Sequence, residues 1–420
     1  MANVVVIGGG GREHAICYFL KKSKKVDKIY CIPGNGGISQ IAECIDIPVM
    51  DFDKIIAYLN TLKNIDLIVV APDDPLVAGL VDELEKNGYR AFGPNKRAAI
   101  LEGSKAFSKE LMLKYNIPTA KYKEFLDYES FKNYINSQTK FPLVVKADGL
   151  ALGKGVIIAQ TKEEAFQAGL DMLVNYKFNK AGNKVIVEEF LEGKEVSILT
   201  FTDGKTIIPM VSSQDHKRAF DNDLGLNTGG MGTFSPSKCY TKDMEKYVYE
   251  NIILKTVDAL NKENRQFKGV IYFGLMLTSD GPKVLEYNAR FGDPETQVVL
   301  PRLKTDLYEI FNACIDQTLD KVNIEWVDKE VVCVILASGG YPESYEKGFE
   351  IKIGDIDSDV MLFHAGDKMV DGKLVTAGGR VLGVTAMGDN IEEARKKAYK
   401  NVEKINFKNM QYRKDIGIKL

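Results

Sequence analysis

Four consecutive glycines directly after an apolar segment constrain the fold of this chain more than any other feature. Residues 4–7 are Val or Ile, residues 8–11 are all Gly, and a helical pattern follows from about Arg12. Further strand-like runs at 28–32 and 67–70 are separated by helical patterns. Apolar strands separated by helices are typical of a parallel sheet with helices on both faces. The first hundred residues therefore predict a doubly wound α/β domain that ends near residues 94–103.

The rest of the chain predicts mixed α+β structure. Residues 122–187 read as strand, helix, strand, strand, helix, strand, and the glycine-rich link between the two middle strands predicts a hairpin. Residues 185–300 are rich in strand-like runs, which a helical pattern over 241–261 interrupts. The last ninety residues contain strand-like runs at 331–337 and 381–386 and a final helix that Asn390 caps.

Composition excludes several classes of protein. The 420 residues carry 56 Lys plus Arg and 58 Asp plus Glu, so the formal net charge is −2. This balance argues against a protein that coats nucleic acid, although it leaves a local basic cleft open. The six cysteines have no C-x-x-C spacing, which disfavours a thiolate zinc knuckle, and their sparseness suits a reducing cytosol. Without a basic leader or an apolar run of about 18 residues, we expect a soluble cytoplasmic protein.

The first glycine run fails the test for a dinucleotide-binding loop. The fingerprint G-x-G-x-x-G needs a glycine where Glu13 stands, and an acidic residue after the second strand, where the chain reads CIPGN at 31–35. A helix N-terminus behind glycines still favours an anion. We expect either a phosphate or small polar substrate at this loop, or a tight turn without a ligand.

A second glycine-rich segment, KADGLALGKG at 146–155, only superficially resembles a P-loop. Gly155 stands where a P-loop needs Ser or Thr, and a strand follows instead of a helix. The segment predicts a cationic hairpin in which Lys146 and Lys154 reach phosphates, with backbone amides assisting. The alternative is a mobile surface hairpin.

A third segment joins DHKR at 215–218 to GGMG at 229–232 through a long polar loop. Long loops of this kind are uncommon unless they are functional, and the mixture of cations and glycines favours an anionic ligand. The alternative is a solvated loop. The three histidines, at 14, 216 and 364, stand in no recognisable arrangement with a Ser or Cys nucleophile, which disfavours covalent catalysis.

Two further segments carry carboxylates. Because side chains alternate along a strand, Glu286, Asn288 and Arg290 share one face. A carboxylate beside an amide oxygen suits Mg²⁺ that also binds phosphates, and Arg290 suits a carboxylate or a phosphate. The segment EEFLEGKE at 188–195 reads as strand, turn and strand start, so its backbone can hold an adenine and Glu195 can accept from ribose hydroxyls. The alternatives are a strand with one face in water and a solvated turn.

Taken together, these segments resemble the ATP-grasp ligases, and the whole chain resembles the glycinamide ribonucleotide synthetase (phosphoribosylamine–glycine ligase) family among them. The family's motifs stand in order over essentially all 420 residues. They read GGGGREH at 8–14, PGNGG at 33–37, LEGSKAFSK at 101–109, VVKADGLALGKGV at 144–156, EEFLEG at 188–193, SQDHKRAFD at 213–221, NTGGMGTFSP at 227–236, RFGDPETQ at 290–297 and GGYP at 339–342. RFGDPE combined with DHKR and NTGGMG is the specific part of this match.

The resemblance implies a fold and a reaction. It implies a pre-ATP-grasp domain over residues 1–103, an ATP-grasp domain over 104–122 and 190–326, a flap domain over 123–189, and a C-terminal α+β domain over 327–420. In the implied reaction, ATP phosphorylates the glycine carboxylate, and the amine of 5-phosphoribosylamine attacks the glycyl phosphate. The products are glycinamide ribonucleotide, ADP and phosphate, in de novo purine biosynthesis. We expect ATP with Mg²⁺ or Mn²⁺ as cofactors, no nucleic-acid or membrane partner, and a monomer.

The resemblance also assigns roles to residues. Lys146 and Arg290 are the predicted catalytic residues, and Glu286 and Asn288 the predicted metal ligands. The predicted ATP-binding residues are Lys105, Lys146, Gly153, Lys154, Gly155, Glu188, Glu189, Phe190, Leu191 and Glu195. The predicted substrate-binding residues are Gly10, Gly11, Asp215, Lys217, Arg218, Gly230, Arg290, Pro294 and Glu295.

Two positions depart from the family pattern. Where the family often has a Gly-Pro-Glu turn, this chain has Ala71-Pro72-Asp73, so the pattern does not decide whether Asp73 contacts the substrate. The strand before Glu286 reads FGLML at 273–277, without the acidic metal ligand that many ATP-grasp enzymes place there.

The motifs disfavour three rival functions. The RFGDPE and DHKR motifs disfavour another ATP-grasp ligase, such as a carboxylase of a purine intermediate or of biotin. The presence of Lys146, Glu286 and Asn288 disfavours a non-catalytic nucleotide-binding regulator, and the failed fingerprint disfavours a Rossmann dehydrogenase.

Overall fold

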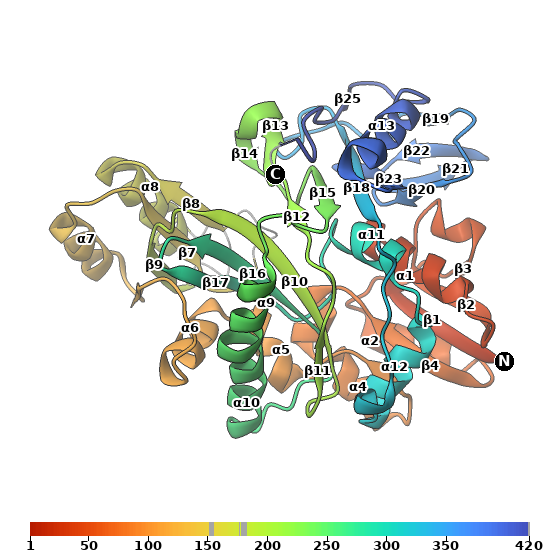
Figure 1. The fold of residues 1–420 in the computed structure, drawn as a ribbon, viewed down its shortest axis with the longest axis horizontal. Coiled ribbons are helices and arrows are strands. Elements are labelled where there is room, and N and C mark those ends of the chain that lie inside the picture. Colours follow the sequence, from red (N-terminus) through yellow and green to blue (C-terminus); the bar gives the residue numbers. More distant parts are fainter. Residues whose placement is uncertain (151–154, 176, 178–182, 419–420) are drawn as a thin grey trace.

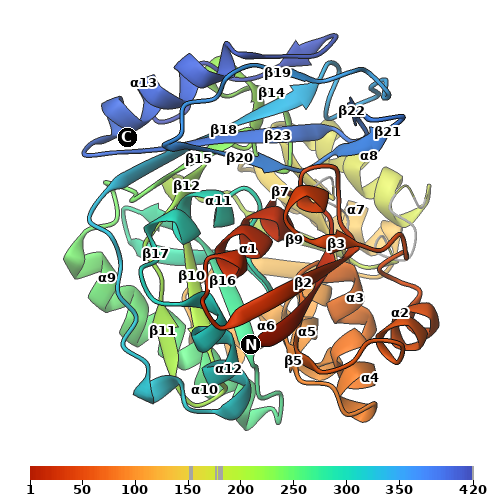
Figure 2. The same ribbon diagram turned by 90° about the vertical axis from the view of Figure 1, so that its right-hand side faces the viewer.

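A computed structural model describes residues 1–150, 155–175, 177 and 183–418. Four larger sheets organise these residues: a five-stranded N-terminal sheet, a four-stranded flap sheet, a four-stranded central sheet and a six-stranded C-terminal sheet. The flap lies at one end of the molecule, and the central sheet separates it from the N-terminal part (Figure 1). The C-terminal sheet lies across the top of the molecule, above the N-terminal sheet (Figure 2). Among the described residues, no helix combines the length and the apolar character that a membrane span needs.

The N-terminal sheet is parallel, as predicted, with the strand order β3-β2-β1-β4-β5. Alternate residues of β1 enter different cores: Val4 and Val6 pack with α1, whereas Val5 and Ile7 pack with α2, α3 and α4. This division confirms a doubly wound sheet. Its strands are β1 (Ala2–Gly8), β2 (Val26–Pro33), β3 (Glu43–Cys44), β4 (Ile65–Val70) and β5 (Ala91–Phe92), and its helices are α1 (Gly11–Lys21), α2 (Phe52–Leu59), α3 (Asp73–Ala78), α4 (Leu80–Lys86) and α5 (Lys96–Gly103).

The flap contains the six elements that the sequence predicts, in the predicted order. They are β6 (Tyr122–Phe125), α7 (Tyr128–Ser137), β7 (Leu143–Ala147), β8 (Val156–Ala159), α8 (Lys162–Leu173) and β9 (Val185–Glu189). The strands form an antiparallel sheet in the order β6-β9-β7-β8, and β7 and β8 are the predicted hairpin. The two helices bury Phe131, Ile135 and Met172 against this sheet.

The central sheet is antiparallel with the order β11-β10-β16-β17. Its strands are β10 (Lys194–Thr202), β11 (Ile207–Pro209), β16 (Gly269–Thr278) and β17 (Gly281–Asn288), and the associated helices are α6 (Lys105–Lys114), α9 (Lys242–Val248), α10 (Leu254–Lys262), α11 (Thr296–Val299) and α12 (Leu307–Asp316). The helical pattern predicted over 241–261 corresponds to α9 and α10, which a π-helical turn at Tyr249–Ile253 joins.

The C-terminal sheet draws strands from two distant parts of the chain. Its order is β12-β15-β18-β23-β20, and β25 pairs with β18. The strands are β12 (Gln214–Asp215), β15 (Gly232–Ser235), β18 (Glu330–Ser338), β20 (Val360–His364), β23 (Arg380–Gly388) and β25 (Met410–Gln411), and α13 (Ile391–Val402) packs on the sheet. Because β12 and β15 come from the segment predicted for the central domain, the loop that carries DHKR and GGMG is anchored in the C-terminal sheet. Between them, β13 (Arg218–Phe220) and β14 (Leu224–Asn227) form a small hairpin.

Gly169 in α8 generates a test of the flap packing. An alanine inside a helix normally stabilises it by about 1 kcal/mol relative to glycine. Here a Cβ at position 169 would lie 2.2 Å from the ring of the fully buried Phe131. We therefore expect G169A to destabilise the flap by about 1–3 kcal/mol, measured as faster amide hydrogen exchange in peptides from 122–189. Q167A on the exposed side of α8 is the control, and we expect it to stay within about 0.5 kcal/mol of the unsubstituted protein. Equal exchange in G169A and the unsubstituted protein would contradict the packing.

Candidate active site

The candidate site is built around the end of β17. This strand pairs antiparallel with β16, so that Gly274 lies opposite Glu286 and Tyr272 lies opposite Asn288. Glu286 and Asn288 are both half-buried, with the buried Tyr287 between them, as a shared face requires. A Cβ at Gly274 would lie 3.1 Å from Cγ of Glu286, so the glycine leaves room for that carboxylate.

Three lysines gather around the carboxylate of Glu286. Nζ of Lys217 lies 3.5 Å from Glu286 Oε1 and 3.5 Å from Glu195 Oε2. The positive charge of Lys217, assisted by Lys146 and Lys105, lowers the pKa of Glu286 to about 2, although burial acts in the opposite direction. Glu286 therefore remains an ionised oxygen ligand at neutral pH.

Lys146 shares a buried carboxylate with a second lysine. Its Nζ lies 2.9 Å from Glu188 Oε1, and Nζ of Lys109 lies 3.0 Å from Glu188 Oε2. The side chain of Glu188, predicted as part of the nucleotide hinge, is thus held between two ammonium groups. Lys109 ends the family motif at 101–109, but the motif predicts no role for it. Its position in the pattern of buried residues along α6 indicates only that its side chain faces the interior.

The remaining hinge residues line the connection from β9 to β10. Leu191 is buried in a small cluster with Ala120 and Met276, whereas 37% of Phe190 is exposed. Glu189 Oε1 accepts a hydrogen bond of 2.9 Å from the backbone of Lys121. These side-chain contacts do not test the predicted role of the hinge backbone in binding the adenine, which stays a prediction.

The hairpin of the flap contacts the start of α6. Lys105 donates from Nζ to the carbonyl of Gly149 at 2.9 Å, and burial lowers its pKa. The carbonyl of Gly155 accepts from the backbone of Ala147 at 2.8 Å. Gly153 and Lys154, also predicted to bind ATP, lie outside the described residues.

Glu102 organises the residues that follow β17. Its Oε2 accepts from the backbone of Ala289 at 2.7 Å, and its Oε1 lies 2.8 Å from Nη2 of Arg290. Because a carboxylate oxygen accepts, the side-chain amide of Asn288 presents its nitrogen to Oε1, at 3.0 Å, and its oxygen to the other side. Asp73 Oδ2 lies 3.8 Å from the same Arg290 nitrogen, so the shortened carboxylate remains beside the arginine. No role for Glu102 could be predicted, because a single acid near the end of a short helix carries no sign of its distant partners.

Four predicted substrate residues come together between β12, β15 and the cis Asp293–Pro294 turn. A Cβ at Gly230 would lie 2.5 Å from Pro294 Cδ and 2.7 Å from Asp215 Oδ1. The buried Glu295 accepts from the hydroxyl of Tyr272 at 3.1 Å. Burial, with the nearby charge of Glu295, raises the pKa of Asp215.

Arg218 is directed elsewhere. Its guanidinium donates to the carbonyl of Gly225 at 2.8 Å, within the β13–β14 hairpin. Nothing in the described contacts brings this side chain to Glu286, and its predicted role in substrate binding stays a prediction.

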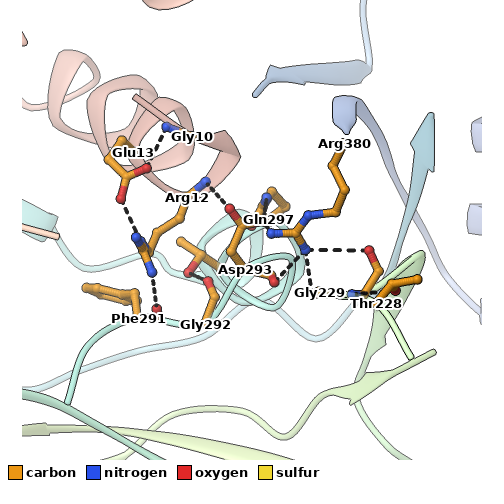
Figure 3. A network of polar contacts seen from close by, with 12 residues as sticks. Gly10, Arg12, Glu13, Thr228, Gly229, Phe291, Gly292, Asp293, Gln297 and Arg380 are labelled. Atoms are coloured by element: carbon orange, nitrogen blue, oxygen red, sulfur yellow. Dashed lines mark hydrogen bonds and ion pairs between the residues drawn. The ribbon is translucent and has the colours of Figure 1, made fainter. Parts of the chain in front are cut away.

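The glycine run at the start of α1 meets carboxylates of the chain itself (Figure 3). The amide of Gly10 donates to Glu13 Oε2 at 2.7 Å, and the amide of Arg12 donates to Asp293 Oδ2 at 3.4 Å. A Cβ at Gly11 would lie 2.6 Å from Nε2 of Gln297, so this glycine permits close packing. The sequence predicted an anion at this helix terminus, and in the structure Asp293 is one such anion. Substrate contacts of Gly10 and Gly11 stay predictions.

Arg380 connects the C-terminal sheet to the two loops that contain Gly229 and Asp293. Its Nη1 donates to the carbonyl of Asp293 at 2.7 Å and to the carbonyl of Gly229 at 2.5 Å, and its Nη2 lies 3.3 Å from Asp293 Oδ1 (Figure 3). Sequence reasoning missed Arg380 and Asp293, because neither residue stands in a periodic pattern that points to the other.

Family comparisons match this arrangement over nearly the whole chain. Three models of the phosphoribosylglycinamide synthetase family match the sequence. The N-domain model matches residues 2–102, the ATP-grasp (A) domain model residues 103–296, and the C-domain model residues 331–419. The chain belongs to the phosphoribosylglycinamide synthetase family. This membership confirms the resemblance and the ATP-grasp architecture that the motifs predict.

Individual relatives support the family assignment. The phosphoribosylamine–glycine ligase of Caldanaerobacter subterraneus subsp. tengcongensis is 49% identical over 416 residues, which cover 99% of each chain. A crystal structure of phosphoribosylamine–glycine ligase from Thermotoga maritima is similar with a TM-score of 0.84 at 35% identity, covering 99% of this chain and 100% of that one. The biotin carboxylase domain of Hydrogenobacter thermophilus 2-oxoglutarate carboxylase, in complex with MgADP and bicarbonate, has a TM-score of 0.75 at 14% identity over 98% of this chain and 91% of that one. At that identity the likeness shows a shared fold.

The contacts of Arg380 lead to a prediction about loop order. Arg380→Met removes three hydrogen bonds to loop carbonyls, one of them long at 3.5 Å, and one ion pair, and hydrogen bonds to charged groups are worth about 1.5–3 kcal/mol each. We expect amide exchange in peptides covering 227–232 and 290–297 to accelerate at least tenfold, because one such bond corresponds to about a tenfold change. The control is Lys373→Met, since Lys373 pairs with Glu350 on the surface of the same domain. Unchanged exchange in both peptides would show that Arg380 does not hold these loops.

Proposed function

We propose that this chain joins glycine to 5-phosphoribosylamine with ATP, through glycyl phosphate, giving glycinamide ribonucleotide, ADP and phosphate in de novo purine biosynthesis. The observation that carries the proposal is the gathering of Lys105, Lys146 and Lys217 around the ionised Glu286, beside Asn288. This gathering occurs in a chain that is 49% identical to a named phosphoribosylamine–glycine ligase. The proposal includes a monomeric state and a cytoplasmic location.

The nucleotide is assigned to the junction of flap and central sheet. Lys105 and Lys146 bind its phosphates, and the flap residues Gly153, Lys154 and Gly155 cover them. The hinge at Glu188, Glu189, Phe190 and Leu191 holds the adenine, and Glu195 binds the ribose. The MgADP complex of the biotin carboxylase relative supports a nucleotide as the ligand class of this fold.

The donor set at the end of β17 fits a hard divalent cation. Glu286 provides an ionised carboxylate, and the Asn288 amide presents its nitrogen to Glu102, which leaves its oxygen for a cation. Mg²⁺ or Mn²⁺ accepts such oxygen ligands and takes its remaining ligands from phosphate and water. When bound, the metal neutralises charge on the transferred phosphoryl group. Among the described residues, no cluster of three or more His, Cys, Asp or Glu side chains offers a different metal site.

Glycine and phosphoribosylamine are assigned to Arg290 and to the glycine-rich loops. Arg290 binds the glycine carboxylate and later the acyl phosphate, and it is positioned by Glu102 and Asp73. The remaining predicted contacts with glycine or phosphoribosylamine are Gly10, Gly11, Asp215, Lys217, Arg218, Gly230, Pro294 and Glu295.

The chemistry needs no protein nucleophile. A carboxylate oxygen of glycine attacks the γ-phosphorus of ATP, and ADP leaves. The amine of phosphoribosylamine then attacks the carbonyl carbon, the phosphate leaves, and the amine loses a proton. The protein contributes orientation and fixed positive charge, which together can account for most of the rate. Closure of the flap over the acyl phosphate excludes water.

Isotope transfer tests the reaction and its intermediate together. We expect ADP and phosphate only when glycine, freshly generated 5-phosphoribosylamine, ATP and Mg²⁺ are all present. With carboxylate-labelled [¹⁸O]glycine, the phosphate should carry one ¹⁸O atom, because the oxygen that attacks ATP leaves with the phosphate. Absence of glycine-dependent turnover would refute the function, whereas turnover with unlabelled phosphate would refute only the acyl phosphate.

Glu286→Gln tests the metal assignment. Loss of the carboxylate should lower kcat by about 100-fold or more, because the charge of the transferred phosphoryl group is then poorly neutralised. It should also weaken Mn²⁺ binding in the presence of ADP, measured by electron paramagnetic resonance, with an unchanged circular dichroism spectrum. Glu110→Gln on the exposed side of α6 is the matched control. Normal Mn²⁺ binding by the Glu286 variant would remove this residue from the metal site.

A further inference from the structure

Lys109, Glu188 and Lys146 form a buried lysine–glutamate triad at the root of the flap. One Glu188 oxygen lies 3.0 Å from Nζ of Lys109 and the other lies 2.9 Å from Nζ of Lys146. Their side chains are 3%, 2% and 9% exposed, with Glu188 the most buried. Fully buried lysines are rare unless they are paired, so Lys109 requires a physical explanation.

The triad holds two cations for one anion. A neutral pair of Lys146 and Glu188 would already satisfy the usual pairing of buried charges, and a third buried charge adds a desolvation cost. Burial lowers the pKa of Lys109 to about 8, although the charge of Glu188 opposes this shift. With all three groups ionised, the triad carries a net charge of +1. Without Lys109 the same place would be neutral.

Lys109 is also fixed on the side away from Glu188. It donates from Nζ to Thr119 Oγ1 at 2.8 Å, and Thr119 donates to the carbonyl of Val284 at 2.7 Å. Val284 belongs to β17, the strand that carries Glu286, whereas Lys146 and Glu188 belong to the flap strands β7 and β9. Lys109 therefore connects the flap sheet to the strand with the proposed metal ligands.

We propose that Lys109 is a positioning residue of the nucleotide site that neutralises Glu188 and so leaves the positive charge of Lys146 for the phosphates. Glu188 holds Lys146 in place, and Lys109 prevents Glu188 from cancelling the charge of Lys146. This inference rests on the proposed function, which places the phosphates of ATP beside Lys146. Lys109 acts through Glu188 and Lys146.

The test compares ligands with and without phosphates. MgADP and adenosine binding are measured by calorimetry for the unsubstituted protein, Lys109→Met and Lys114→Met. Lys114 lies on the same helix and pairs with Glu263 at the surface, so its variant is the matched control. We expect Lys109→Met to weaken MgADP binding about tenfold, which corresponds to about 1.4 kcal/mol, and to change adenosine binding less than about twofold. Lys114→Met should bind both ligands normally.

A double variant separates charge from packing. Lys109→Met with Glu188→Gln removes one cation and one anion, so the net charge of +1 on Lys146 returns. Because Glu188 is itself a proposed hinge residue, the quantity compared is the ratio of MgADP affinity to adenosine affinity, in which a loss at the hinge cancels. This ratio should lie within about threefold of that of the unsubstituted protein, a difference of less than about 0.7 kcal/mol. This variant leaves no buried carboxylate short of a partner, and it keeps the test decisive if Lys109→Met alone does not fold.

Three outcomes would overturn the inference. Unchanged binding of MgADP by Lys109→Met would show that its charge does not matter, and equal weakening of both ligands would show that Lys109 only shapes the pocket. A double variant whose ratio of MgADP affinity to adenosine affinity falls about tenfold below that of the unsubstituted protein would refute the charge account. If the unsubstituted protein itself fails to bind MgADP, that result refutes the proposed nucleotide site, and with it the inference about Lys109.

Discussion

Attraction between Glu286 and its surrounding lysines is the interaction on which the candidate site depends. Lys105 lies in α6, Lys146 in β7 and Lys217 in the loop after β12, and their like charges would repel one another without an anion between them. Glu286 is one such anion, and its pKa of about 2 keeps it charged at neutral pH. Bringing these cations to one place also explains how a chain of net charge −2 can serve anionic substrates, because the charge is arranged locally.

The fold brings this charge cluster together with loops that are remote in sequence. β12 and β15 pair into the C-terminal sheet through β18, so the DHKR and GGMG segments take their positions from strands that follow nearly a hundred residues later. Arg12 and Asp293 are 281 residues apart, yet the amide of one donates to the carboxylate of the other. Arg380 of the C-terminal strand β23 then donates to the carbonyls of both Asp293 and Gly229. The C-terminal sheet is thus part of the site's construction.

The sequence predicted the elements well where the deciding forces are local. Apolar periodicity and glycine turns predicted the parallel N-terminal sheet, the six flap elements and the hairpin of β7 and β8, because each depends on neighbours along the chain. After β4 the chain forms two short helices, α3 and α4, since Gly79 between them adopts a left-handed conformation with φ of 104°. For the site, the motifs indicated Lys105, Lys146, Lys217 and Glu286 as candidate residues, and their roles stay predictions.

The partners of those residues could not be predicted in the same way. Glu102 accepts from Ala289, 187 residues later, and Lys109 in α6 reaches Glu188 in the flap strand β9. No repeating pattern connects such residues, because their contact exists only after the domains pack. The motifs around both residues were recognised as family features, but periodicity shows only that a side chain is buried and not which charge it meets.

The two kinds of lysine contact in the site differ in how readily they can exchange partners. Nζ of Lys217 lies 3.5 Å from each of its two carboxylates, and all three side chains are between 34% and 47% exposed, so these contacts are longer and more open to solvent than those of the triad. The contacts within the triad are 2.9–3.0 Å long between side chains that are at most 9% exposed, and breaking a buried pair costs about 3–5 kcal/mol. In the proposed function, a phosphate can reach Lys217 from the solvent side, whereas at Lys146 it must be added without removing Glu188. For that reason the buried lysine needs a permanent second cation beside its carboxylate, and the exposed one does not.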